Sequence, residues 1–216
     1  MKTYALADLS RSTLAEIADI HHEPKQPAVW ETLAQHPLGE RDLTKLGFLV
    51  EQLVDYKTVR VNEATIWARA IYPLLAMAER GDIRAWSLVP LAATFAEAEL
   101  RGEADGALAA SIDEEVGLPY LVVVEAKRGV GARDPMAQLL GAMLCAAWLN
   151  AQKHGYAGEI YGCYTVADVW TFVRGRFDGS QQKPIMAVLS SREYSEKWEA
   201  PMILGILESI VGKYAA

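Results

Sequence analysis

The spacing of apolar positions predicts five helices in the chain. Apolar residues recur every three or four positions over residues 10–21, 40–56, 62–80, 134–155 and 194–214, as in helices with one buried face. Pro73 lies inside the third helix and is expected to kink or split it, because proline cannot donate the helical hydrogen bond. Pro24, Pro27 and Pro37 indicate an irregular segment between the first two helices.

Short stretches rich in β-branched and apolar residues predict the strands. They cover residues 84–90, 94–100, 103–111, 119–127, 158–165, 168–175 and 184–190. Gly102 is expected to permit a tight reversal between two of them. The order of helices and strands predicts an α/β fold of the α+β kind, with a mixed sheet flanked by helices. We expect residues 1–60 to form an N-terminal helical extension and residues 61–216 to form the main domain.

Composition places the chain among ordinary globular proteins. It has 216 residues, of which 51% are hydrophobic and 23% are charged, and this length allows one substantial core. No segment approaches the ~20 apolar residues of a membrane span, and no apolar run follows the early lysine as in a secretory signal. Cys145 and Cys163 lie outside any Cys/His cluster. We therefore expect a cytoplasmic protein with reduced cysteines and no membrane partner.

The formal net charge of -7 excludes a broadly basic surface of the kind that binds nucleic acid by charge alone. Charge is nevertheless uneven along the chain. Glu and Asp are frequent over residues 97–125, whereas basic residues follow at Lys127, Arg128, Arg133, Lys153, Arg174, Arg176 and Lys183. The sequence is therefore compatible with a local basic surface beside an acidic centre.

A carboxylate and an ammonium end an otherwise buried strand. Residues 121–124 are all Leu or Val, yet Glu125 and Lys127 follow without a turn residue. Side chains two apart in a strand share a face, with Cα atoms about 6 to 7 Å apart. If the two neighbouring strands form a hairpin, Asp105 meets Glu125 across the ladder. Two buried carboxylates then favour a hard cation such as Mg²⁺ or Mn²⁺, because a bound cation offsets the cost of burying them.

Asp105 followed by Glu125-Ala126-Lys127 resembles the signature of the PD-(D/E)XK nuclease superfamily, the restriction-endonuclease-like fold. Such families place a glutamate near the start of the helix before the sheet, and Glu63 matches it. Many place a glutamine on the helix after the lysine strand, and Gln138 matches that position. Residues 161–177 are similar to the two closing strands. The likeness covers residues 60–210, although the position before Asp105 is alanine and not proline.

The resemblance implies Mg²⁺-dependent hydrolysis of phosphodiester bonds in nucleic acid, with DNA favoured over RNA. Asp105, Glu125, the main-chain carbonyl of Ala126 and Glu63 would bind one or two Mg²⁺ ions. Lys127 would orient the attacking water or stabilise developing charge. Three further residues take part by the same resemblance: Gln138 orients substrate or water, and Arg128 and Arg133 hold a flanking phosphate. A homodimer is a further expectation by analogy with the family.

Each of these residues also has an ordinary structural interpretation. In this interpretation, Glu125 and Lys127 form an ordinary surface ion pair. Glu63 is a first-turn carboxylate that the helix dipole stabilises, and Gln138 is solvated. Two other functions stay open on the sequence. One is a catalytically inactive nuclease-fold protein that binds nucleic acid or acts as a scaffold. The other is an oligomeric interaction protein whose helices over residues 40–56 and 194–214 pack against partners.

Overall fold

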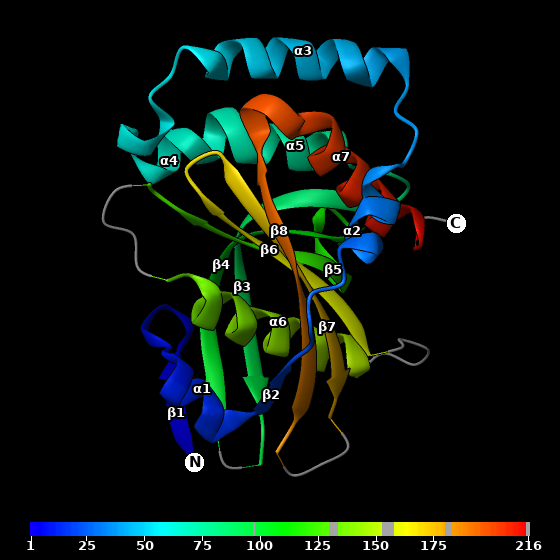
Figure 1. Cartoon of the computed structure of the whole chain (residues 1–216). Helices are drawn as coiled ribbons and strands as arrows, with labels where there is room; N and C mark the ends of the chain where they lie inside the picture. The colour runs from blue at the N-terminus through cyan, green and yellow to red at the C-terminus, as the bar shows by residue number, and fades with distance from the viewer. Residues whose placement is uncertain (97, 130–133, 153–157, 180–182, 215–216) are drawn as a thin grey trace.

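The computed structural model of the chain describes residues 1–96, 98–129, 134–152, 158–179 and 183–214. Groups of consecutive helices and groups of consecutive strands follow one another along it (Figure 1). The strands are β1 (Lys2–Ala5), β2 (Asp19–His22), β3 (Ile83–Thr94), β4 (Ala98–Ile112), β5 (Glu115–Lys127), β6 (Glu159–Val166), β7 (Val169–Asp178) and β8 (Ile185–Ser195). The helices are α1 (Arg11–Ile17), α2 (Pro27–Ala34), α3 (Glu40–Val54), α4 (Glu63–Ile66), α5 (Tyr72–Met77), α6 (Met136–Ala151) and α7 (Glu196–Gly212). Two 3₁₀ turns, η1 (Leu6–Asp8) and η2 (Thr58–Arg60), and one π-helical turn, η3 (Trp67–Ile71), complete them.

The described strands form a single mixed sheet in the order β1-β4-β5-β6-β7-β8-β2, with β3 paired to β4. Because β3 pairs with residues 99–110 of β4, it occupies one side of that strand. The other side is shared: β1 pairs with residues 98–101 and β5 pairs with residues 106–112. The predicted mixed sheet flanked by helices is therefore confirmed.

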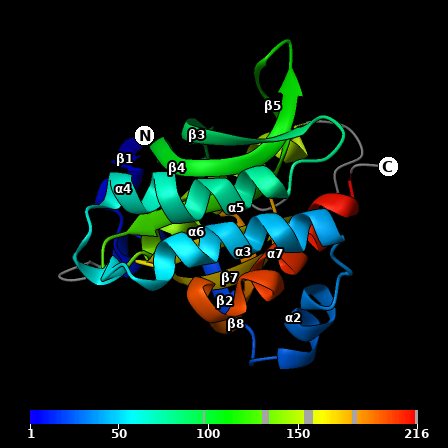
Figure 2. The same ribbon diagram turned by 90° about the horizontal axis from the view of Figure 1, so that it is seen from above.

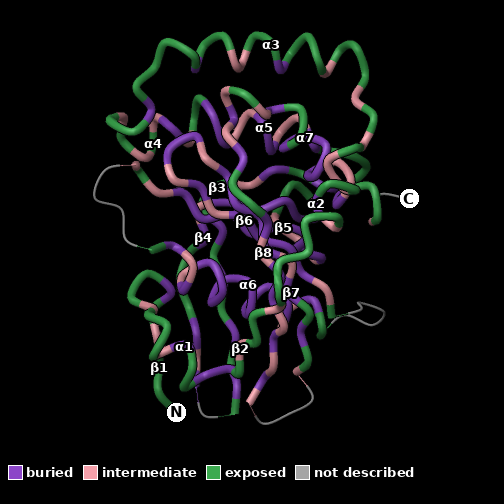
Figure 3. Tube along the Cα trace, in the orientation of Figure 1, coloured by how far each residue is buried: buried purple, intermediate pink, exposed green. Residues whose placement is uncertain are grey.

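Alternation along β5 buries both faces of the sheet. Val122 and Val124 point into one core, which they share with α3, α5 and α7, and Val123 points into the other, which lies against α6. Figure 2 shows α3, α5 and α7 stacked over the first face. In Figure 3, α6 is buried along most of its length, whereas the outer surface of α3 is exposed. A strand covered on both faces reads as a continuous apolar run, which explains residues 121–124.

The first 60 residues contribute strands as well as helices. The helix predicted over residues 10–21 ends at Ile17, and Asp19–His22 pairs in parallel with β8 as an edge strand. The segment expected to be irregular contains α2, which Pro27 begins at a position where no helical N–H is needed. Since β1 lies beside β4 at one end of the sheet order, the N-terminal segment joins two separate parts of the sheet.

The predicted reversal at Gly102 is wrong. Residues 98–112 form one continuous strand, and the chain reverses between Thr94 and Ala98. Gly102 instead allows a close approach, because a Cβ atom there would lie 2.9 Å from Cβ of Leu6. Its φ of 156° adds a second reason for glycine at this position.

The helix predicted over residues 62–80 is divided, as Pro73 indicated. Asn62 caps α4 by accepting a hydrogen bond from the Thr65 amide. The chain then widens into the π-helical turn η3, in which the Tyr72 amide donates to the carbonyl of Trp67. Proline in the first turn of α5 removes one helical donor, and the wider turn accommodates it. This division places α4 and Trp67 over β4.

Candidate functional site where β4 and β5 separate

β4 and β5 separate at Asp105. Their paired register runs to Gly106 opposite Val124, one step short of placing Asp105 opposite Glu125. Beyond that point, β5 continues in parallel with β6 as far as Lys127. The Ala126 amide has no β4 partner there and donates to Oδ2 of Asp105 at 2.6 Å. The side chain of Asp105 therefore replaces a ladder hydrogen bond at the point where the strands separate.

Glu125 is held inside the protein at this junction. Its side chain is buried, with 0% of the residue exposed. Oε1 accepts a hydrogen bond from the Nζ ammonium of Lys127, two residues further on the same face of β5. Oε2 is buried too, and it has no hydrogen-bond partner among the described residues. An unpaired buried acceptor costs free energy, so this oxygen favours a proton or a cation.

Burial and neighbouring charge act together on these groups. Burial first, and then the Asp105 carboxylate, raise the pKa of Glu125 to about 8, although the Lys127 ammonium opposes the change. Burial alone would lower the pKa of Lys127, but Glu125, Asp105 and Glu63 outweigh it and raise that pKa. Lys127 is therefore charged near pH 7, and burial of Glu125 favours a proton or a cation on its carboxylate.

Glu63 lies beside the same junction, in a pocket of about 510 Å³. It is the first residue of α4, directly after the Asn62 cap. α4, the π-helical turn, β3, β4 and β5 all contribute to the pocket, whose lining residues are Glu63, Ala64, Trp67, Ser87, Leu88, Asp105 and Ala126. We call it the acidic pocket. Its open volume brings solvent to the partly buried Asp105, whereas Ala126 is buried.

The carboxylates fit a hard divalent cation only as a partial ligand set. Among the residues that the structure describes, no group of three or more His, Cys, Asp or Glu side chains is arranged so that it could hold a metal ion. Glu63 therefore does not complete a three-carboxylate cluster with Asp105 and Glu125. Mg²⁺, however, is commonly bound by one or two carboxylates together with water and substrate phosphates. Asp105 and the unpaired Oε2 of Glu125 supply that contribution.

The remaining predicted residues are not among those that line the acidic pocket, or they lie outside the described residues. Gln138 is half-buried in the first turn of α6 and is not part of the pocket lining. Arg128 is exposed just after β5. Arg133 lies outside the described residues. The structure thus brings Asp105, Glu125, Lys127 and Glu63 together and leaves Gln138 and Arg128 outside that group.

Two features of this region were missed in the sequence. Trp67 fits the apolar spacing of its helix, but the residue is half-buried and lines the acidic pocket. Leu88 lies on a strand predicted as ordinary, yet its φ is 53° and its side chain faces solvent. No periodicity signals a positive φ at leucine, because the conformation depends on the pairing of β3 with β4.

A second buried acidic pair lies at the start of α7. Asp168 accepts a hydrogen bond from the Thr58 hydroxyl. Glu196 accepts one from the indole of Trp170 at 2.8 Å. Burial first, and then Asp168, raise the pKa of Glu196 to about 8. These groups connect η2, the β6–β7 turn and α7, which is a structural role.

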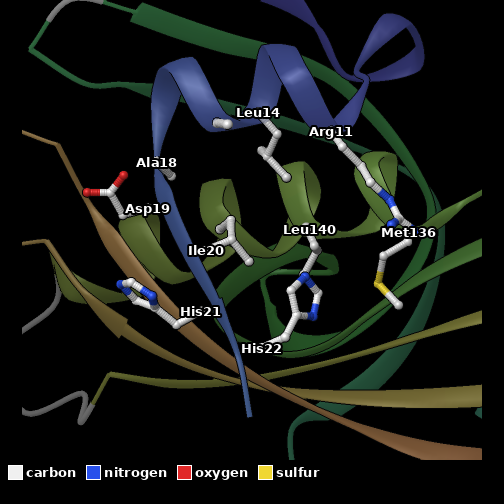
Figure 4. A pocket seen from close by; sticks show the side chains of 10 residues that line it. Arg11, Leu14, Ala18, Asp19, Ile20, His21, His22, Met136 and Leu140 are labelled. Atoms are coloured by element: carbon white, nitrogen blue, oxygen red, sulfur yellow. The ribbon is translucent and has the colours of Figure 1, made fainter.

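Another pocket, of about 270 Å³, lies between α1, β2 and α6 and shares no lining residue with the acidic pocket (Figure 4). His21 and His22 follow each other in β2, and Figure 4 shows their rings directed to different sides of the strand. Arg11 at the rim pairs with Asp134 at 2.8 Å. The two histidines therefore do not converge on one ligand.

No protein-family model matches the chain, and a search of the curated proteins found no match either. Among the described residues, no helix is both long and apolar enough to cross a membrane.

Proposed function

We propose that the protein hydrolyses phosphodiester bonds in nucleic acid, with Mg²⁺ or Mn²⁺ as cofactor and DNA as the favoured substrate. One observation carries the proposal: a fully buried glutamate, Glu125, faces both Asp105 and Lys127 where two strands separate beside an open pocket. The nuclease signature places the same three residue types at this point of its sheet, and that resemblance favours DNA.

Each side chain has a separate task in this proposal. Asp105 and Glu125 hold the cation, with the Ala126 amide fixing the orientation of the Asp105 carboxylate. Lys127, released from Glu125 when a cation takes its place, donates hydrogen bonds to the attacking water or to a phosphate oxygen. The bound cation supplies a water of lowered pKa and stabilises charge on the phosphate. Glu63 lies at the other side of the pocket and binds an outer water.

The charge of the site supports a requirement for metal. Asp105 and Glu63 surround the same pocket, and Lys127 is already paired to Glu125. A phosphodiester approaching these groups without a cation meets net negative charge, which repels it. A divalent cation held by Asp105 and Glu125 would offset that negative charge. We therefore expect both substrate binding and hydrolysis to depend on Mg²⁺ or Mn²⁺.

The ion pair between Lys127 and Glu125 also favours a second function. An ammonium held by a carboxylate is unavailable to substrate until the pair opens. Several other basic groups are occupied as well: Arg176 pairs with Glu23, and Lys183 pairs with Asp19 at 2.5 Å. The alternative is therefore a nuclease-fold protein that binds nucleic acid, or acts as a scaffold, without cleaving it.

Cleavage assays separate the two functions. Supercoiled plasmid and synthetic DNA and RNA are incubated with the protein in Mg²⁺, in Mn²⁺ and in EDTA. The proposal predicts nicking in either metal, none in EDTA, and a loss of at least about 100-fold in Lys127→Ala, as for removal of one charge-stabilising group. Lys183→Ala is the matched control, because it removes a lysine from an ion pair outside the site. Metal-dependent binding without cleavage of any substrate would favour the alternative.

A further inference from the structure

An apolar wall stands directly beside the carboxylates of the acidic pocket. Trp67 forms part of it and is fixed from two sides. Its ring covers Gly106, where a Cβ atom would lie only 2.3 Å from Cη2 of the indole. Its Nε1 donates to the hydroxyl of Ser87 at 3.0 Å. The exposed part of the indole lines the acidic pocket, so the pocket has a rigid aromatic surface.

Leu88 forms the other apolar side of the pocket in an unusual backbone conformation. In the neighbouring pairs of the ladder, Ser87 lies opposite Gly106 and Val89 lies opposite Ala104. Leu88 of β3 therefore lies beside Asp105 of β4. Its φ of 53° is in the left-handed region, which is unfavourable for a side chain branched beyond Cβ. The residue is 66% exposed. Strain at a solvent-exposed leucine is commonly retained where the side chain has a task.

The apolar and acidic residues that line the pocket together indicate which kind of ligand it binds. A volume of about 510 Å³ lies in the range of pockets for small organic groups. Flat aromatic groups stack on a fixed indole, and Leu88 adds a second apolar contact in the same pocket. A carboxylate accepts hydrogen bonds from the amino groups of a base. The phosphate attached to such a group would lie toward Asp105 and Lys127.

Resting on the function proposed above, we infer that the acidic pocket binds one unpaired nucleobase next to the scissile phosphate. Bases in an intact duplex are stacked on their neighbours and cannot enter a side pocket, whereas a base in a single strand or at a flap can. The preferred substrate is therefore single-stranded nucleic acid, or a duplex with an unpaired nucleotide at the cleavage point. Trp67 and Leu88 determine this preference by contacting the base.

Binding is measured without cleavage, in a Lys127→Met background with Mg²⁺. The probes are a fluorescent single-stranded DNA 20-mer and the same strand in a blunt duplex, followed by fluorescence anisotropy. We expect the single strand to bind at least about tenfold more tightly than the duplex. Trp67→Ala should reduce single-strand affinity by about tenfold, in line with the loss of one base–aromatic stack, and leave duplex affinity unchanged.

Leu88→Gly provides a variant that folds, because glycine adopts the left-handed backbone without strain. We expect it to reduce single-strand affinity about threefold to tenfold. Ile112→Ala is the matched control: it removes an aliphatic side chain that is 52% exposed at the far end of β4. Equal affinity for single strand and duplex, or equal effects of Leu88→Gly and Ile112→Ala, would overturn the inference.

Cleavage of the same two probes by the otherwise unaltered protein distinguishes failure of the inference from failure of the proposed function. Hydrolysis of both probes at one rate, unchanged by Leu88→Gly, would leave the nuclease function in place and remove the base pocket. A single-strand preference that depends on Leu88, without any hydrolysis, would keep the base pocket and reject the hydrolytic function.

Discussion

Asp105 accepts a hydrogen bond from the backbone amide of Ala126 at the point where β4 and β5 cease to pair. This contact gives Asp105 two roles, since the carboxylate both ends the ladder and presents its other oxygen to the acidic pocket. A residue with a structural and a chemical role can be tested by variants that remove one role at a time.

Asp105→Asn and Asp105→Ala separate those roles. Asparagine keeps an oxygen that accepts the Ala126 hydrogen bond but carries no charge, so we expect near-normal stability and weakened binding of Mn²⁺. Alanine leaves the buried Ala126 amide unpaired, at a cost of about 1–3 kcal/mol. Urea denaturation measures the free energy of unfolding, and calorimetric titration measures Mn²⁺ binding.

Equal stability of the two variants would show that the Ala126 contact is not structurally important. Unchanged Mn²⁺ affinity in Asp105→Asn would remove Asp105 from the ligand set.

The buried Glu125 makes stability depend on pH. Its pKa in the folded protein is about 8, above the ordinary value of 4.5, so the folded state binds more protons between those two values. The contribution of Glu125 to the free energy of unfolding is therefore greatest at low pH. It falls as the pH rises toward 8, by roughly several kcal/mol. Glu196 contributes with the same sign, because its pKa is also raised to about 8.

Denaturation midpoints measured between pH 5 and pH 8.5 test this dependence. Glu125→Gln should flatten the curve in part, and a second change, Glu196→Gln, should flatten it further. Mg²⁺ should stabilise the unaltered protein more at pH 8 than at pH 6, because the cation replaces a proton on Glu125. A pH dependence identical in Glu125→Gln and the unaltered protein would contradict the assignment.

Gly106 is expected to be intolerant of any side chain. A Cβ atom there would lie 2.3 Å from the Trp67 ring and 2.6 Å from the carbonyl oxygen of Trp86, and the second contact is with backbone that cannot rotate away. Gly106→Ala should therefore destabilise the protein by about 1–3 kcal/mol. Gly47→Ala is the control, because a Cβ atom there meets nothing within 4 Å.

Gly47 lies inside α3, where glycine is a poorer helix former than alanine. Gly47→Ala should therefore raise the free energy of unfolding by about 0.8–1 kcal/mol. Urea denaturation of both variants measures the two effects. If Gly106→Ala is as stable as the unaltered protein, the close packing of Trp67 on β4 is incorrect.

Local patterns were sufficient to predict where β5 ends and which side chains there share a face. Glu125 and Lys127 share a face because the strand period is two, and a hairpin register brings Asp105 beside them. The helical start at Glu63 followed from the Asn62 cap. These features depend on neighbouring residues in the chain, which is why sequence patterns contain them.

The features that were not predicted depend on contacts between distant segments. Asp19–His22 becomes a strand only because β8 offers an edge. Leu88 takes a positive φ where β3 meets the separating end of β4. Gly102 continues a strand because Leu6 packs against it. A single sequence gives no signal for such pairings, so the apolar wall of the pocket appeared only in the folded structure.

Anomalous scattering from a crystal soaked in Mn²⁺ is the most direct test of whether Asp105 and Glu125 bind a divalent cation. We expect a manganese peak in contact with the carboxylate of Asp105 and with Oε2 of Glu125. This buried oxygen has no hydrogen-bond partner among the described residues. Lys127 should then have moved from Glu125 toward the solvent side of the pocket. A crystal with no manganese between Asp105 and Glu125, and with Lys127 still paired to Glu125, would contradict the account.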